Sequence, residues 1–279
     1  MKILITGASS YVGAEIYTYL KDKFEVVGTY NSNKLFEELQ QLDITHKEDV
    51  ESVISKANPD YVIHIAAVAS GGWCDKNEDL TKDINEKGTE NVVEAANNVN
   101  AKVIYISSFS AIYPTSLYGK TKLAGEEFVK KAKAGFNILQ PSLIMGYSPN
   151  TKNDRPFNRL LNNLLEKTPA VYDSSWKFQA TYLRHISEII LKIIESNISN
   201  QTIPIAVPEL TSRFKLAKDI LSPFGIEVTE EDQNKETPVY SEDLSKLKEL
   251  GLPEYSYSEM IENIIQEIKN NFPEPATKE

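Results

Sequence analysis

Short apolar runs alternate with longer amphipathic stretches along the first half of the chain. The Val- and Ile-rich runs predict five strands, and the periodic stretches between them predict four helices. We expect strands at Lys2–Thr6, Glu25–Tyr30, Tyr61–Ala66, Lys102–Ser107 and Phe136–Gln140, and helices near Ser10–Lys21, Lys47–Lys56, Asp79–Asn98 and Leu117–Ala134. Because nearly continuous apolar strands indicate a sheet covered on both faces, we predict an α/β fold with a doubly wound parallel (Rossmann) sheet.

The pattern changes after about residue 147, where a segment rich in proline and asparagine begins. Further helices are expected at Phe157–Lys167, Thr181–Glu195, Lys215–Phe224 and Tyr257–Asn271, and a strand at Ile203–Val207. We therefore expect a main domain of residues 1–148 plus about 181–207, and a smaller interleaved C-terminal lobe of residues 149–180 and 208–272. Residues 273–279 are expected to form a frayed tail.

Composition and charge narrow the class of protein. The 279 residues contain no apolar run of the roughly 18 residues that a membrane helix needs, and the first strand begins at once, so we expect no signal peptide. A net charge of −10 argues against a nucleic-acid partner. The single cysteine, Cys74, fits a reducing cytoplasm, and the three histidines show no metal-binding spacing.

The first strand leads into a glycine turn that is typical of dinucleotide-binding proteins. Gly7 permits a tight turn, and Gly13 allows the following helix to pack close to the strand. Ser10 stands where the pattern usually has its middle glycine, and its hydroxyl could donate a hydrogen bond to a phosphate. Tyr11 and Val12 complete the turn. The alternative is a plain strand–helix turn without a ligand.

The end of the second strand indicates which cofactor is preferred. An NAD site usually has an acidic residue here to bind the ribose 2′-hydroxyl, but Asn31 and Ser32 follow this strand and no acid appears before Glu37. A neutral and basic segment suits a 2′-phosphate, so we predict NADP(H) as the preferred cofactor and leave NAD(H) open. The alternative is an ordinary polar loop.

Two further segments are expected to border the cofactor. Asp43 and Ile44 are placed to contact the adenine, although Asp43 could instead be a solvated turn residue. The small side chains of Ala66, Ala67 and Val68 would let a cofactor lie across the strand ends.

Tyr118 and Lys122 indicate the chemistry. A tyrosine has a pKa near 10, and a lysine four residues later lies on the same helix face, where its charge and that of an oxidised nicotinamide favour the phenolate. Lowering the pKa of the tyrosine by about 3 units requires the phenolate to be stabilised by roughly 4 kcal/mol. Tyr118 would donate a proton to a carbonyl oxygen as a hydride arrives, and Lys122 would also hold the nicotinamide ribose. The alternative is a solvated surface helix.

A serine beside the tyrosine is expected to bind the same carbonyl oxygen. We assign this role to Ser108, with Ser107 and Ser110 left open. Of the other candidates, His64 is expected in the core and His185 is a weaker site candidate. Tyr113 and Trp73 would line the pocket or pack in the core.

These residues resemble the extended short-chain dehydrogenases/reductases, and the branch of the dTDP-4-dehydrorhamnose reductases above all. The resemblance spans nearly the whole chain and is most specific at the segment that begins with Tyr118. The similar segments are Lys2–Gly13, Pro59–Ala67, Cys74–Asn91, Tyr118–Glu126 and Tyr240–Leu252. The resemblance implies a dinucleotide-binding domain, a nucleotide-sugar lobe, and a Ser–Tyr–Lys triad formed by Ser108, Tyr118 and Lys122.

The chain also departs from this family pattern. Only nine residues separate Ser108 from Tyr118, where family members carry a longer segment that covers the substrate. Phe109 replaces an acidic residue, and Gln140 stands where an arginine is common. The acidic pair of the nucleotide-sugar dehydratases is absent, which argues against dehydration.

Three functions are consistent with these features. The first is an NADP(H)-dependent reductase of a keto group on a nucleotide-activated sugar, and the second is an NAD-dependent nucleotide-sugar epimerase. The third is a non-catalytic NADP-binding regulator that resembles the β subunit of methionine adenosyltransferase. The resemblance also implies a homodimer formed through Asp79–Asn98 and Leu117–Ala134.

Overall fold

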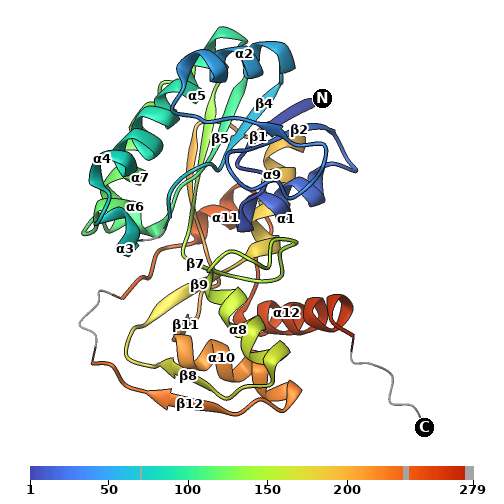
Figure 1. Ribbon diagram of the computed structural model, residues 1–279, viewed down its shortest axis with the longest axis vertical. Coiled ribbons are helices and arrows are strands. Elements are labelled where there is room, and N and C mark those ends of the chain that lie inside the picture. Colours follow the sequence, from blue (N-terminus) through green and yellow to red (C-terminus); the bar gives the residue numbers. More distant parts are fainter. Residues whose placement is uncertain (70, 235–238, 274–279) are drawn as a thin grey trace.

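A seven-stranded parallel sheet forms the centre of the computed structural model, which describes residues 1–69, 71–234 and 239–273 (Figure 1). Its strands are β1 (Lys2–Thr6), β2 (Glu25–Tyr30), β3 (Gln40–Gln41), β4 (Tyr61–His64), β5 (Lys102–Ile106), β6 (Phe136–Pro141) and β10 (Gln201–Ile205). They are ordered β10-β6-β5-β4-β1-β2-β3. The predicted α/β fold is confirmed. The strand β3 was not predicted, because two glutamines carry no apolar signal.

Helices cover both faces of this sheet, because successive residues of each strand point to opposite faces. Ile3 and Ile5 pack into the core cluster that contains Ile16, whereas Leu4 packs into the one that contains Val50. The first face is covered by α1 (Tyr11–Leu20) and α9 (Leu183–Glu195), and the second by α2 (Lys47–Ala57), α5 (Gly88–Asn98) and α7 (Leu117–Val129). The predicted helices in these regions are confirmed.

The stretch predicted as one helix over Asp79–Asn98 is interrupted. It consists of α4 (Glu78–Lys82), a π-helical turn at Asp83–Lys87, and α5. The wide turn contains the buried Asn85, whose amide accepts a hydrogen bond from Val68 N (2.8 Å) and donates to Val68 O (3.0 Å). A third bond joins Asn85 Nδ2 to Thr121 Oγ1 at 3.0 Å. The turn thereby fixes the segment that follows β4.

The C-terminal part contains five short strands whose residue ranges the sequence did not predict. They are β7 (Leu143–Met145), β8 (Ala170–Asp173), β9 (Phe178–Tyr182), β11 (Leu210–Thr211) and β12 (Val228–Glu231), paired as β11-β9-β7 and β12-β8. The remaining helices are α3 (Gly71–Cys74), α6 (Phe109–Ile112), α8 (Pro156–Glu166), α10 (Arg213–Leu221) with a 3-10 turn at Ser222–Phe224, α11 (Ser245–Glu249) and α12 (Tyr257–Asn271).

Most of the C-terminal strands and helices, among them β8, β12 and α10, lie below the main sheet in Figure 1. Helix α9 instead packs against the main sheet. Strand β9 includes Thr181 and Tyr182, which were predicted as the start of a helix. The division of the chain into a main domain and a separate lobe stays a prediction. The expected tail lies outside the described residues apart from Pro273.

The loop between β7 and α8 is hydrogen-bonded to the turn after β1. Tyr11 Oη donates to Gly146 O at 2.5 Å, and Ser148 Oγ donates to Tyr11 O at 2.6 Å. Asn150 Nδ2 donates to Ser9 O at 2.6 Å. All of these groups are buried, so this loop is attached to the main sheet at several points.

A second connection joins α6 to the segment before α11. The ring of Tyr113 stacks on that of Tyr240, with 4.8 Å between centroids and 8° between planes. Tyr113 Oη donates to Glu242 Oε1 at 2.6 Å. The lower part of the molecule is therefore joined to the main sheet at two separate places.

Candidate active site

Two adjoining cavities lie at the carboxyl edge of the main sheet, where parallel α/β sheets bind ligands at the reversal of strand order. Here the chain runs from β1 outward to β2 on one side and to β4 on the other. The central cavity (about 240 Å³) contains Ser108, Tyr118 and Lys122, and the cofactor-side cavity (about 250 Å³) contains Asn31 and Asp43. They share Ser10 and Ala67 in their walls, so they form two parts of one cleft.

The glycine turn packs as tightly as its sequence suggests. Gly7 has a φ of +71°, and a Cβ added to Gly13 would lie only 2.1 Å from Gly7 O. Ser10 Oγ accepts a hydrogen bond from Gly13 N at 3.0 Å and caps α1, which leaves its hydroxyl hydrogen available to a ligand. The turn therefore fits a dinucleotide phosphate at the helix N-terminus. Cofactor binding by this turn stays a prediction.

The structure brings most of the predicted cofactor residues to these two cavities. Tyr11 and Val12 line the central cavity. Gly13 packs beneath Gly7 and belongs to the support of the turn. The residues at the cofactor-side cavity are Gly7, Ser10, Asn31, Ser32, Asp43, Ile44, Ala66, Ala67 and Val68.

Asp43 is a turn residue in the wall of the cofactor-side cavity, and its contact with the adenine stays a prediction. Its Oδ1 accepts hydrogen bonds from Thr45 N (2.9 Å) and Thr45 Oγ1 (2.8 Å), which makes it a turn residue. It also lines the cofactor-side cavity, as the adenine contact requires. Asn31, Ser32 and Asn33 border the same cavity with uncharged side chains.

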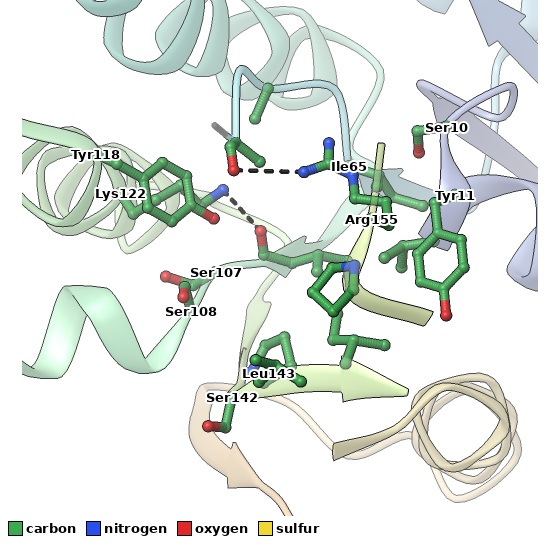
Figure 2. Close-up of a pocket in the computed structure, with 17 residues that line it drawn as sticks. Ser10, Tyr11, Ile65, Ser107, Ser108, Tyr118, Lys122, Ser142, Leu143 and Arg155 are labelled. Carbon is green, nitrogen blue, oxygen red and sulfur yellow. Dashed lines mark hydrogen bonds between the residues drawn. The ribbon is translucent and has the colours of Figure 1, made fainter. Parts of the chain in front are cut away.

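Tyr118 and Ser108 both line the central cavity, because two helix starts are packed against each other (Figure 2). Ser108 caps α6 by accepting from Ser110 N at 3.1 Å, and Ser116 caps α7 by accepting from Gly119 N at 3.1 Å. A Cβ on Gly119 would lie 2.2 Å from Ser110 O, so only glycine permits this approach. The arrangement places a phenol and a hydroxyl on one cavity wall.

Burial dominates the titration of Tyr118. It raises the pKa of the phenol, while a hydrogen bond with Ser108 and the charge of Arg155 act in the opposite direction. Tyr118 is therefore protonated at neutral pH in the protein alone, as a proton donor must be.

Lys122 is buried and lines the central cavity together with Tyr118 (Figure 2). Its Nζ donates to Ile106 O at 2.7 Å and lies 3.9 Å from the ring centroid of Tyr105. Burial lowers the pKa of this ammonium to about 7, against the opposing charge of Glu126. Arg155 is a second cation at this site, and its charge lowers the pKa of Tyr118, while the catalytic role of Lys122 stays a prediction.

Arg155 is a site residue that the sequence did not reveal. It lines the central cavity, and its Nη1 donates to Ala69 O at 3.3 Å, a bond drawn in Figure 2. It directly precedes α8, whose first residue, Pro156, also lines the cavity. A proline at the start of a helix was the signal available in the sequence, and it marks the helix without assigning a role to the preceding residue.

Two of the three histidines, His64 and His185, are buried and hydrogen-bonded within the fold. His64 is fully buried, with Nδ1 2.7 Å from Thr6 Oγ1 and Nε2 3.0 Å from Thr89 Oγ1. Burial, and secondarily the charge of Lys122, lowers the pKa of His64 to about 3. His185 is also buried, with Nε2 2.7 Å from Pro253 O, and it lines neither the central nor the cofactor-side cavity.

The two aromatic candidates lie outside the central cavity. Tyr113 belongs to the connection with Tyr240, and Trp73 is 38% exposed. The described part of the chain contains no cluster of three or more His, Cys, Asp or Glu side chains suited to a metal ion. Within the same residues, no helix combines the length and apolarity that a membrane crossing needs.

The chain is similar to a known protein family and to several known proteins. The family model described as "RmlD substrate binding domain" matches residues 1–269. A GDP-6-deoxy-D-talose 4-dehydrogenase from Aggregatibacter actinomycetemcomitans is 26% identical over 231 residues, which cover 74% of each chain. The Xenopus laevis methionine adenosyltransferase 2 subunit beta is 27% identical over 158 residues, which cover 52% of this chain and 47% of that protein.

A solved structure supports the same fold. The dTDP-4-dehydrorhamnose reductase from Bacillus anthracis str. Ames, crystallised in complex with NADP, superposes with a TM-score of 0.82 at 22% identity. The superposition covers 96% of this chain and 99% of that one.

Proposed function

Because this chain belongs to the family of the RmlD substrate binding domain, we propose that it is an NADP(H)-dependent reductase of a keto group on a nucleotide-activated sugar. The observation that carries the proposal is the common position of Tyr118, Ser108 and Arg155 on the central cavity, beside the glycine turn. The name of the Aggregatibacter relative, a dehydrogenase of a nucleotide sugar, agrees with this substrate class.

Tyr118 acts as the proton donor in this mechanism. NADPH, which the glycine turn from Gly7 to Gly13 would hold, would supply the hydride for the new C–H bond at the carbonyl carbon. As the C=O π bond breaks, the phenol hydrogen of Tyr118 passes to the carbonyl oxygen and leaves a phenolate. The charge of Arg155 and the hydrogen bond with Ser108, which both favour the phenolate, stabilise this product state.

In the same mechanism, Lys122 holds the backbone at the end of β5 in place. Its ammonium donates to Ile106 O at the end of β5, directly before the two serines. It also lines the central cavity, so a donor hydrogen remains for the nicotinamide ribose that we assign to it.

The cofactor preference follows from the polar, uncharged end of β2. Asn31 and Ser32 line the cofactor-side cavity without a carboxylate at the position that repels a 2′-phosphate. We infer that NADP(H) is preferred and that NAD(H) binds more weakly.

The test is a set of nucleotide 4-keto sugars incubated with NADPH and followed at the nicotinamide absorbance. Net oxidation of NADPH with the appearance of the alcohol supports the reductase. Tightly retained NAD after purification, with isomerisation and no net oxidation, would indicate the epimerase instead.

A regulatory role is a second candidate, favoured by the similarity to the methionine adenosyltransferase subunit and by the short segment between Ser108 and Tyr118. Stoichiometric capture of an enzyme partner, together with no turnover of any keto sugar, would support it.

We further propose that the protein forms a homodimer in the cytoplasm. The contact would use α4, α5 and α7, which pack together on one face of the sheet. Sedimentation analysis tests this assembly, and a monomer at micromolar concentration would contradict it.

A further inference from the structure

The buried carboxylate of Glu126 takes no direct part in the proposed hydride and proton transfers. Glu126 belongs to α7, is 3% exposed and does not line the central cavity. Its Oε1 accepts two hydrogen bonds, from Ser107 Oγ at 2.5 Å and from Gln140 Nε2 at 2.9 Å. A carboxylate away from water is costly unless it is hydrogen-bonded and paired with a cation, so its neighbours indicate its role.

Neither donor to Glu126 carries a charge. Ser107 directly follows β5, and Gln140 lies in β6. Gln140 stands where an arginine is common in the family, so β6 offers this carboxylate an amide and no guanidinium. A cation that balances Glu126 therefore has to come from an element other than β6.

Lys122 is a cation on the same side of α7. It precedes Glu126 by four residues, and this spacing places two helical side chains on one face. Lys122 is 2% exposed, and burial lowers the pKa of its ammonium to about 7. The charge of Glu126 acts in the opposite direction and raises that pKa. The positive charge of Lys122 at neutral pH therefore depends in part on Glu126.

The other titratable groups around Lys122 do not supply a negative charge. Burial, and secondarily the charge of Lys122, lowers the pKa of His64 on β4 to about 3, so this imidazole is neutral. The ring centroid of Tyr105 on β5 lies 3.9 Å from Lys122 Nζ, and burial raises the pKa of its phenol. Burial also raises the pKa of Tyr118, and Arg155 beside it is itself a cation. The carboxylate on α7 is therefore the anion that acts on Lys122.

Lys122 and Glu126 also bind two successive residues at the end of β5. Lys122 Nζ donates to Ile106 O at 2.7 Å, and Glu126 accepts from Ser107. Ser108 follows directly and lines the central cavity. The two buried side chains therefore fix the backbone that carries Ser108.

We propose that Glu126 is a positioning residue of this site, which acts as the counter-charge of Lys122 and holds Ser107 in place. The inference rests on the proposed function, because Lys122 and Ser108 are groups of the reductase mechanism. Glu126 contacts neither the substrate nor the cofactor in this role. Without its charge, the buried amine of Lys122 loses its proton at a lower pH, and a neutral amine does not favour the phenolate of Tyr118.

The test follows the titration of Lys122 directly, by NMR of the full chain with isotope-labelled lysine, in which Lys122→Met identifies the signal. Glu126→Gln removes the charge and keeps an oxygen that can accept from Ser107 and Gln140. We expect it to lower the midpoint of the Lys122 titration by about 1 pH unit. The matched control is Glu127→Gln, an exposed carboxylate on the same helix, which should leave the midpoint unchanged.

Two further variants separate the charge of Glu126 from its hydrogen bonds. Gln140→Arg brings a guanidinium to the same carboxylate and should also lower the Lys122 midpoint, so it tests the counter-charge even if Glu126→Gln does not fold. Ser107→Ala removes a hydrogen bond and keeps the charge, so the midpoint should stay at the wild-type value. A shifted midpoint in Ser107→Ala would assign the effect to the hydrogen bond and overturn the counter-charge.

The titration distinguishes a failure of this proposal from a failure of the reductase. An unchanged Lys122 midpoint in folded Glu126→Gln overturns the counter-charge. With NADPH and a keto sugar, Glu126→Gln should move the fall of kcat at rising pH down by the same amount, whereas a uniform loss of kcat would show a merely structural role. Because the titration needs no turnover, a wild-type chain that reduces no keto sugar would contradict the reductase and leave the counter-charge intact.

Discussion

Ser107 and Ser108 both border the central cavity, but only Ser108 has a hydroxyl hydrogen to give. Ser107 Oγ donates its single hydrogen to Glu126 Oε1 at 2.5 Å, and Gln140 Nε2 donates to the same oxygen at 2.9 Å. Ser108 Oγ accepts from Ser110 N at 3.1 Å, and its other hydrogen bond is with Tyr118, its neighbour in the cavity wall. The three serines left open by the sequence are thus distinguished by their hydrogen-bond partners, which favour Ser108 as the group that contacts the substrate oxygen.

The two serines should respond differently to the same substitution. We expect Ser108→Ala to lower turnover about 100-fold and to cost about 1 kcal/mol of unfolding free energy through its cap. Ser107→Ala should instead cost about 1–3 kcal/mol, because a partner of the buried Glu126 is lost, with a smaller effect on turnover. Steady-state kinetics and urea unfolding measure both effects, and the reverse ranking of turnover would assign the role to Ser107.

Tyr118→Phe removes the proposed proton donor without changing the shape of the cavity wall. We expect turnover to fall by about 100-fold or more, while NADPH affinity changes less than a few-fold. Tyr61→Phe, at the opposite end of the sheet, is the matched control. Fluorescence titration and the absorbance assay give the two quantities. Activity retained by the Tyr118 variant would refute the mechanism.

Arg155 should shift the pH dependence of the reverse reaction. Oxidation of the alcohol requires the phenolate of Tyr118, and removal of a nearby cation raises the pKa of that phenol. We therefore expect Arg155→Met to move the rise of the oxidation rate to higher pH by about 0.5–1 unit, with Arg155→Lys close to the wild type. A profile of kcat against pH decides this, since a fall in rate without a shift would indicate only a structural role.

An acid at the end of β2 should change the cofactor preference. Asn31→Asp places a carboxylate in the cofactor-side cavity, where it repels a 2′-phosphate and can accept from a ribose hydroxyl. We expect NADPH affinity to fall about tenfold or more relative to NADH. Asn100→Asp, an exposed residue before β5, is the control for added charge. Equal wild-type affinities for the two cofactors would contradict the NADP(H) preference.

His64 should make the fold sensitive to acid. Its pKa in the folded chain is about 3, below the ordinary value of 6.5, so the unfolded chain binds the proton that the folded chain excludes. Its contribution to stability is full above pH 6.5 and is lost as the pH falls toward 3, at up to about 1.4 kcal/mol per unit. We expect His64→Asn to flatten this part of the profile of unfolding free energy. The exposed His46→Asn should leave it unchanged.

The fold and one wall of the site could be predicted because the residues that indicate them lie close together in the sequence. Gly7 and Gly13 stand within one turn, and Tyr118 and Lys122 within one turn of helix, so the spacing alone places each pair together. Spacing does not determine what a long side chain contacts, so the hydrogen bond from the Lys122 ammonium to Ile106 O could not be predicted.

Residues brought in from distant segments could not be predicted in this way. Arg155 reaches the cavity through the loop between β7 and α8, far along the chain from Tyr118 and the glycine turn. Strands such as β7 and β8 span three or four residues, too few for a periodic pattern to show. Their side chains acquire a role only once the tertiary fold is known.

The attachment of the lower half of the molecule at two separate places has a kinetic consequence. Asn150 and Ser148 join it beside the glycine turn, and Tyr113 joins it again at Tyr240. A clamshell motion would have to break both sets of contacts at once. We therefore expect ligands to reach Tyr118 through a standing aperture, whose width determines which ligand substituents pass and how quickly a ligand leaves.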